Sequence, residues 1–228
     1  MFRRITSDSR FFCGLLAGLL LHSPSLTAEP DKAQVRPLPG ALELSEISES
    51  ETMNSERKEL VDLALSLGRK HRLNSYLFGS ADPAKGGFDC SGSMYFILTE
   101  AGLKPARSSA AQYEWIKQAG LLSEVPKESH SLDAPVFEKL MPGDLVFWAG
   151  TYQPTDGRTN KVTHVQMYLG IEEATGKPVM IGSSDGRSYA GTARCGFGVY
   201  EFRVPRKGSK SRIVGFGPPP GLLPKDDD

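Results

Sequence analysis

The chain has 228 residues, and its 27 basic and 27 acidic side chains give a formal net charge of zero at pH 7. Because neither a basic surplus nor a block of like charge is present, the composition argues against a nucleic-acid-binding protein and against attachment to an anionic membrane. The length and an apolar fraction of 39% suit one globular domain with tails.

The first 28 residues have the layout of a secretory signal peptide. Arg3, Arg4 and Arg10 precede the apolar run "FFCGLLAGLLL", and the segment ends at Ala28. The run is shorter than the roughly 20 residues that span a bilayer, which favours cleavage over the alternative of an uncleaved anchor. We therefore expect a secreted or periplasmic protein, free of the membrane after cleavage, whose mature chain is close to neutral.

Helical spacing marks three segments in the first half of the chain. In residues 55–71, leucines from Leu60 to Leu67 recur on one helix face. The segment 90–102 has the composition of a buried helix that ends at a glycine, and 108–120 begins with a serine suited to capping. Before them, residues 29–54 are rich in Pro, Ser and Glu and predict a flexible linker.

After Pro142 the pattern changes to short runs rich in β-branched and aromatic residues, separated by glycines, which predict antiparallel strands joined by hairpins. Helices followed by strands indicate an α+β domain, which we expect to cover residues 55–217. The tail, 218–228, has no pattern and is predicted to be disordered. The expected strands are 144–150, 162–172, 177–184, 196–204 and 212–217.

Cys90 lies in the stretch "GFDCSG", and Cys195 is the only other cysteine after residue 28. Cys90 could be a buried structural thiol, half of a disulfide with Cys195, or a nucleophile. Its place at the start of a predicted helix favours the nucleophile, because unpaired N–H groups there stabilise a thiolate and can bind an oxyanion. No C-x-x-C or H-x-x-x-H spacing is present, so we expect no metal and no cofactor.

A cysteine nucleophile needs an imidazole, and three histidines follow residue 28. His71 falls at a helix end and His130 in a polar loop, where solvated histidines are ordinary. His164 lies in the alternating strand "VTHVQMYLG", on the same face as Gln166 and Tyr168. A histidine at a fixed place on a sheet suits a general base, although a purely structural role is the alternative.

Five short stretches in order complete a recognisable pattern. They are "SYLFG", "FDCSG", "ARSSAAQY", "MPGDLVFW" and "THVQMYLG". Together they resemble the NlpC/P60 cysteine peptidases, over roughly residues 55–217. The resemblance implies a papain-like α+β fold, with the cysteine helix packed on a central, barrel-like antiparallel sheet. It also implies hydrolysis of peptidoglycan stem peptides, typically at the amide between γ-D-glutamate and a diamino acid.

Carried over by position, the resemblance makes Cys90 the nucleophile and His164 the base. Tyr76 would lie near the thiol, and Asp89 and Ser91 would line the substrate cleft. The family's Arg-x-Ser-x-x-Gln pattern falls on three further residues that would contact substrate, or would merely start a helix. These three are Arg107, Ser109 and Gln112.

The third catalytic position of the family, which orients the imidazole, falls here on Gly182, which has no side chain. We therefore predict that Ser184, one step further on the same face, orients His164, with a water or a backbone carbonyl as alternatives. A second departure is the long hairpin loop "GTYQPTDGRTNK", residues 150–161, which could shape access to a cleft.

The sequence thus predicts a secreted, monomeric cysteine endopeptidase whose partner is the peptide part of peptidoglycan. Because the third histidine is missing, a wall-binding module with impaired catalysis on the same fold is the main alternative. An amidase or thioesterase acting on another acyl substrate is the other. We expect no nucleic-acid partner.

Overall fold

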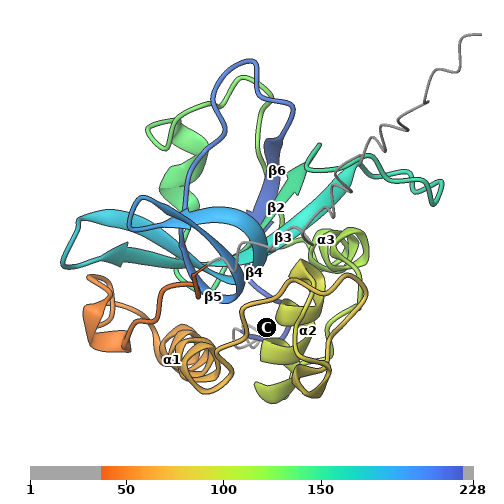
Figure 1. Ribbon diagram of the computed structural model, residues 1–228. Helices are drawn as coiled ribbons and strands as arrows, with labels where there is room; N and C mark the ends of the chain where they lie inside the picture. Colours follow the sequence, from red (N-terminus) through yellow and green to blue (C-terminus); the bar gives the residue numbers. More distant parts are fainter. Residues whose placement is uncertain (1–36, 223–228) are drawn as a thin grey trace, which may run out of the picture. The chain divides into compact units, whose positions relative to one another are not determined.

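The computed structural model describes residues 37–222 of the chain. Three α-helices precede the six strands of an antiparallel sheet. Figure 1 shows how the helices and the sheet are arranged. The helices are α1 (Ser55–Lys70), α2 (Cys90–Glu100) and α3 (Ser109–Gln118). The strands are β1 (Ser123–Glu124), β2 (Leu145–Ala149), β3 (Val162–Glu172), β4 (Lys177–Tyr189), β5 (Thr192–Glu201) and β6 (Arg212–Gly217), and the 3-10 turns are η1 (Leu44–Glu46), η2 (Pro83–Lys85) and η3 (Pro135–Lys139).

The strands are ordered β1-β6-β2-β3-β4-β5, and the two outer strands do not pair with each other. The α+β class and the antiparallel sheet are therefore confirmed, although the sheet stays open and does not close into a barrel. β3 lies between β2 and β4, and its register places His164 directly opposite Trp148. Because β3 is hydrogen-bonded to a strand on each side, the backbone at His164 is fixed in place.

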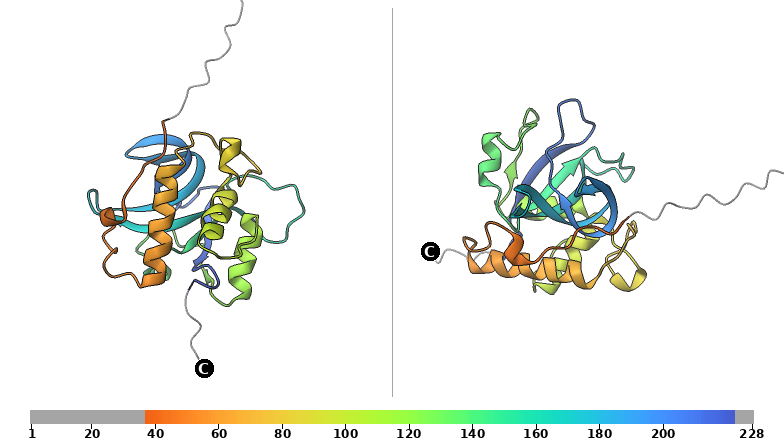
Figure 2. Two further views of the ribbon diagram at one scale, coloured as in Figure 1. Left: turned by 90° about the horizontal axis from the view of Figure 1, so that it is seen from below. Right: turned by 60° about the vertical axis from the view of Figure 1, so that its left-hand side comes forward.

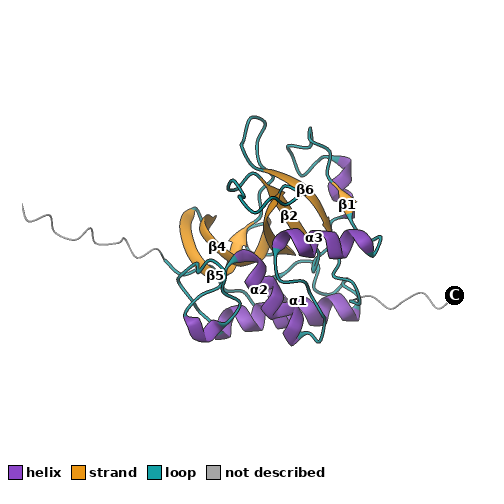
Figure 3. Cartoon of the chain, turned by 90° about the vertical axis from the view of Figure 1, so that its right-hand side faces the viewer, coloured by secondary structure: helices purple, strands orange, loops and turns teal. Residues whose placement is uncertain are grey.

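The three helices lie side by side on one face of the sheet (Figures 2 and 3). Between the two layers lies an apolar core that includes Leu60 of α1, Met94 of α2 and Val165 of β3. The opposite face carries a second cluster around Trp148 and Tyr200, and the segment around η3 contributes to it. Because alternate residues of a strand point to opposite faces, β3 supplies side chains to both clusters.

The segment before α1 belongs to the folded unit, so the predicted flexible linker is wrong for the residues the structure describes. Leu42 and Ile47 are buried in the core. Gly40 pairs with Val199 through hydrogen bonds of 2.9 Å, so the segment covers the outer strand β5 and satisfies its edge. At the other end of the domain, Leu222 packs against the core. The predicted signal peptide, the start of the linker and the last six residues of the tail lie outside the described residues.

A buried ion pair ties α1 to the entrance of β2. The Arg57 guanidinium donates to Asp144 Oδ1 at 2.7 Å and to the Pro142 carbonyl at 2.6 Å. The exposed fractions of the Arg57 and Asp144 side chains are 5% and 2%. Burial raises the pKa of Asp144, and the arginine opposes that rise. The carboxylate therefore depends on its partner to stay ionised inside the protein.

Arg57→Met is expected to lower the free energy of unfolding by about 3–5 kcal/mol, because it leaves a buried carboxylate without its cation. Urea unfolding followed by circular dichroism measures the effect. The matched control is Lys58→Met, which breaks an exposed pair with Glu51 and should cost less than about 1 kcal/mol. Equal losses in the two variants would contradict a special role for the buried pair.

Candidate active site

Cys90 is the first residue of α2, as the sequence predicts, and Asp89 caps the helix. The Asp89 carboxylate accepts a hydrogen bond from the Gly92 backbone N–H at 2.5 Å. Its other oxygen accepts from the Gly79 N–H at 2.8 Å, which fixes the loop before the helix. The side chain of Cys90 is therefore held at one place relative to the helix end. Cys90 is a free thiol, so the disulfide with Cys195 is excluded.

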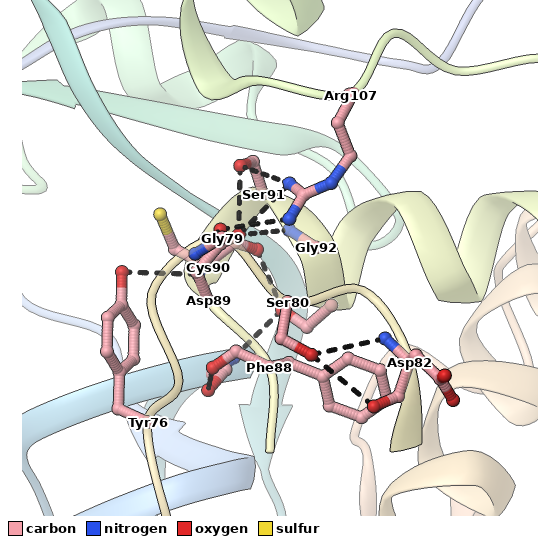
Figure 4. Close-up of polar contacts among 12 residues, drawn as sticks. Tyr76, Gly79, Ser80, Asp82, Phe88, Asp89, Cys90, Ser91, Gly92 and Arg107 are labelled. Atoms are coloured by element: carbon pink, nitrogen blue, oxygen red, sulfur yellow. Dashed lines mark hydrogen bonds and ion pairs between the residues drawn. The ribbon is translucent and has the colours of Figure 1, made fainter. Parts of the chain in front are cut away.

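The sulfur of Cys90 is surrounded by hydrogen-bond donors. It contacts the Tyr76 hydroxyl and the backbone N–H groups of Ser91 and Val165. The Tyr76 hydroxyl also accepts from the Cys90 N–H at 3.4 Å (Figure 4). These donors can stabilise negative charge on sulfur or on a substrate oxygen next to it.

Burial nevertheless raises the pKa of Cys90, and the donors around the sulfur only partly offset it. The expectation of a thiolate at the helix end is thus not met in the substrate-free protein. The exposed fraction of Cys90 is only 5%, and a charge there loses most of its hydration. The thiol is therefore protonated at neutral pH, and a base must take its proton when it attacks.

His164 provides an imidazole in the same region. Its ring lies 5.6 Å from that of Trp148, and its Nε2 accepts a hydrogen bond from Arg187 Nε at 3.3 Å. The Arg187 guanidinium also lies over the Trp148 ring, 4.5 Å from its centroid. Burial first, and the Arg187 cation second, hold the pKa of His164 well below its usual value, while the neighbouring Gln166 amide acts in the opposite direction. The imidazole is therefore neutral, and its lone pair at Nε2 can take a proton once Arg187 no longer donates to it.

Two observations connect the thiol with the imidazole. The sulfur contacts the backbone N–H of Val165, the residue that follows His164. Burial lowers the pKa of Arg187 to about 10, and the thiolate form of Cys90 would raise it, so the two groups are close, while Arg187 in turn donates to His164. The nucleophile and the base predicted from the sequence therefore border one region.

A cleft made of adjoining hollows runs past these residues. Cys90 lines a hollow of about 260 Å³, and His164 lines one of about 690 Å³. Tyr76, Tyr152 and Thr163 line both hollows, so they mark the junction at which a scissile bond could meet thiol and imidazole. Tyr152 comes from the 150–161 loop, which therefore shapes the cleft.

Most of the predicted substrate-contact residues lie in the hollow of Cys90. Arg107 forms a two-pronged ion pair with Asp89 at 3.0 and 3.2 Å and also donates to Ser91 Oγ (Figure 4). The lining residues from the prediction are Tyr76, Asp89, Ser91, Arg107 and Ser109.

Gln112 differs from the other predicted contacts. It is fully buried, and its amide donates to the carbonyls of Ser91 and Ala106 at 3.0 and 2.9 Å. Gln112 thus holds α3 against the start of α2, behind the cleft wall, and does not reach the cleft itself.

Ser184 lines the same hollow as His164, but no hydrogen bond joins its hydroxyl to the imidazole. The groups that contact the imidazole are Gln166 and Arg187, which the sequence prediction missed. A Cβ at Gly182 would lie 2.9 Å from Cγ of Gln166. The Gln166 side chain therefore fills the space next to the position at which the family places its orienting group.

Of the two missed residues, Gln166 could have been predicted from the sequence and Arg187 could not. Gln166 stands two residues after His164 in an alternating strand, which puts both on one face. Arg187 gave no such signal, because "SDGRS" has the composition of a turn. In the structure β4 continues to Tyr189, with an irregularity in its pairing between Asp185 and Ser188.

No three histidine, cysteine or carboxylate side chains among residues 37–222 come together as a metal site, and no helix there is long and apolar enough to cross a membrane.

The chain is similar to a known family of proteins. The model of the NlpC/P60 family matches residues 73–193, more than half of the chain. A comparison with curated proteins finds no match. Two solved structures are similar, an NLP/P60 family protein of Staphylococcus aureus, described as similar to lipoprotein, and an NlpC/P60 family protein of Bacillus cereus.

The Staphylococcus aureus protein is 22% identical with a TM-score of 0.41, and the match covers 71% of this chain and 42% of that one. The Bacillus cereus protein is 24% identical with a TM-score of 0.42, and the match covers 70% of this chain and 40% of that one. The chain thus corresponds to about two fifths of the length of each. Since the family match includes both Cys90 and His164 and spans most of the domain, the chain belongs to the NlpC/P60 family.

Proposed function

We propose that this protein is a cysteine peptidase that hydrolyses amide bonds in peptidoglycan stem peptides, at the bond between γ-D-glutamate and a diamino acid. The observation that carries the proposal is a buried thiol ringed by hydrogen-bond donors, in one cleft with a neutral imidazole. Family membership supports hydrolase chemistry on cell-wall peptides. We also propose that the protein is exported to the cell envelope. Measuring how much of it lies in the cytoplasm and how much outside would test this proposal.

The proposed reaction begins with the protonated thiol. As the sulfur attacks the carbonyl carbon, the Arg187 N–H releases Nε2 of neutral His164, which accepts the thiol proton. The carbonyl oxygen becomes an oxyanion near the Cys90 N–H and the Tyr76 hydroxyl. The C–N bond then breaks while the imidazolium gives its proton to the leaving amine. The thioester that remains is attacked by water, whose proton passes to His164 and then to the departing thiolate.

The geometry gives Arg187 a role in the second of these steps. Its cation lies beside the imidazole, so it destabilises the imidazolium and makes it a stronger acid. A stronger acid transfers its proton more readily to the leaving amine. Arg187 thus acts through His164 as a positioning residue.

The activity is tested by incubating the protein with defined stem peptides and weighing the products. We expect one cleavage, which leaves a γ-D-glutamyl carboxylate on one fragment and a free amine on the other. Intact peptides after long incubation, together with retained binding to purified cell wall, would instead support a binding module. The raised pKa of Cys90 is the observation that favours that second function. Release of an acyl group from a different substrate class would indicate an amidase or thioesterase.

The pH dependence of kcat/KM should report the environment of His164. Because the base must be neutral and its pKa lies well below 6.5, activity should persist below pH 6.5. Arg187→Met removes the cation and raises the pKa of His164, which should move the acid limb to higher pH. Gln166→Met removes the neighbouring amide, which raises the pKa of His164, and should move the acid limb to lower pH. Shifts of the same sign in both variants would contradict this assignment.

A further inference from the structure

The cleft is electrostatically asymmetric. In the hollow of Cys90, both arginines are paired: Arg107 with Asp89 at 3.0 Å, and Arg158 with Asp156. Charge on this side is therefore satisfied within the protein. A ligand entering here meets no strong net field from these groups.

The opposite end, beyond His164, is cationic. A hollow of about 400 Å³ adjoins that of His164, and the two share Gly150, Tyr152, Thr163 and Lys210. Lining residues of this third hollow include four basic side chains and no carboxylate. These four are Lys127, Lys161, Lys210 and Arg212, which we call the basic arm.

The basic arm is not neutralised by the rest of the domain. Within residues 37–222, none of its four side chains forms an ion pair with a carboxylate. The three lysines are exposed. Asp185 is the one carboxylate lining the hollow of His164, and no carboxylate lines the next. Four unpaired cations converge on one hollow of a chain whose formal net charge is zero, so this end of the cleft has an unmatched positive field.

We propose that the basic arm binds the carboxylates of the leaving half of the peptide substrate. This inference rests on the proposed function. The imidazolium must protonate the leaving nitrogen, so the half of the peptide that departs as an amine lies on the side of His164. That half contains the C-terminus of the peptide, and thus a free carboxylate. The peptide would pass from the hollow of His164 into the third hollow, where the lysines can bind this carboxylate. The 150–161 loop supplies Tyr152 and Lys161 to this subsite.

The test uses two stem peptides that differ only at the C-terminus of the leaving half, one a carboxylate and the other a carboxamide. Binding is measured by calorimetry on the Cys90→Ala protein, so no hydrolysis interferes. We expect the carboxylate peptide to bind about tenfold more tightly, with the difference shrinking as salt is added. Combining Cys90→Ala with Lys127→Gln, Lys161→Gln and Lys210→Gln should remove the preference.

The matched control carries Lys104→Gln, Lys139→Gln and Lys177→Gln instead, three exposed lysines that line none of the three hollows. This control should keep the preference, which separates local contacts from a general loss of charge. Equal binding of the two peptides to Cys90→Ala overturns the subsite, even if the wild-type protein cleaves both. A preference for the carboxylate without any cleavage by the wild-type protein upholds the subsite and rejects the peptidase. Binding of a polyphosphate as tight as that of the carboxylate peptide, and lost in the same variant, would show an unspecific anion site and overturn the assignment.

Discussion

Cys90→Ala is expected to reduce the release of stem-peptide fragments by at least about 10⁴-fold, the largest effect of any single substitution in the chain. The reason is that no other group can form the thioester. Neutral His164 would have no thiol from which to take a proton, and water would have to attack the amide directly. The measurement is product formation by mass spectrometry under conditions in which the wild-type protein completes the reaction.

The control for this substitution is Cys195→Ala. Cys195 lies in β5, lines none of the three hollows and should be dispensable for activity. Although Cys90 is buried, the substitution removes only one sulfur atom, so the urea midpoint should fall by no more than a small amount. Fragment release by Cys90→Ala at the wild-type rate would rule out Cys90 as the nucleophile.

The acylation step can also be observed on Cys90 itself. Because burial raises the pKa of the thiol, alkylation by iodoacetamide in the absence of substrate should be slow at pH 7 and should accelerate above the pH at which a free cysteine reacts. A reactive thiol near neutral pH would indicate a preformed thiolate. The two outcomes distinguish proton removal during attack from proton removal before it.

Much of the fold could be predicted because it follows from periodicity. The helix spacing of residues 55–71 matches α1, and the alternation of 162–172 matches β3 residue for residue. The same alternation placed His164 and Gln166 on one face. The position of Cys90 at the start of α2 followed from a glycine-rich loop before it and helix-forming residues after it.

The features that could not be predicted depend on distant parts of the chain. Residues 37–54 have the composition of a linker, but Leu42 and Ile47 are buried in the core and Gly40 forms hydrogen bonds with the outer edge of β5. No local sequence pattern reveals these contacts. Arg187 reaches His164 only because β4 continues through a stretch typical of a turn. The helix end at Cys90 was visible in the sequence, whereas the burial that outweighs its effect on the pKa comes from tertiary packing.

His164→Ala is expected to lower kcat/KM by about 10²–10⁴-fold, the usual contribution of a general acid–base group. Both proton transfers of the proposed reaction would lose their carrier, while Cys90 and its donors stay in place. The matched control is His130→Ala, which removes a histidine from the loop before η3 and should leave activity unchanged.

Loss of activity alone would not separate a base from a structural histidine, since His164 packs against Trp148. Added imidazole provides the distinction. The hollow next to His164, about 690 Å³, is large enough to admit it, so imidazole should restore part of the activity of His164→Ala, in proportion to its unprotonated fraction. A folded His164→Ala protein as active as the wild type would show that another group removes the thiol proton. A folded but inactive variant that regains activity with imidazole would identify the proton carrier by its chemistry, independently of the packing that His164 provides.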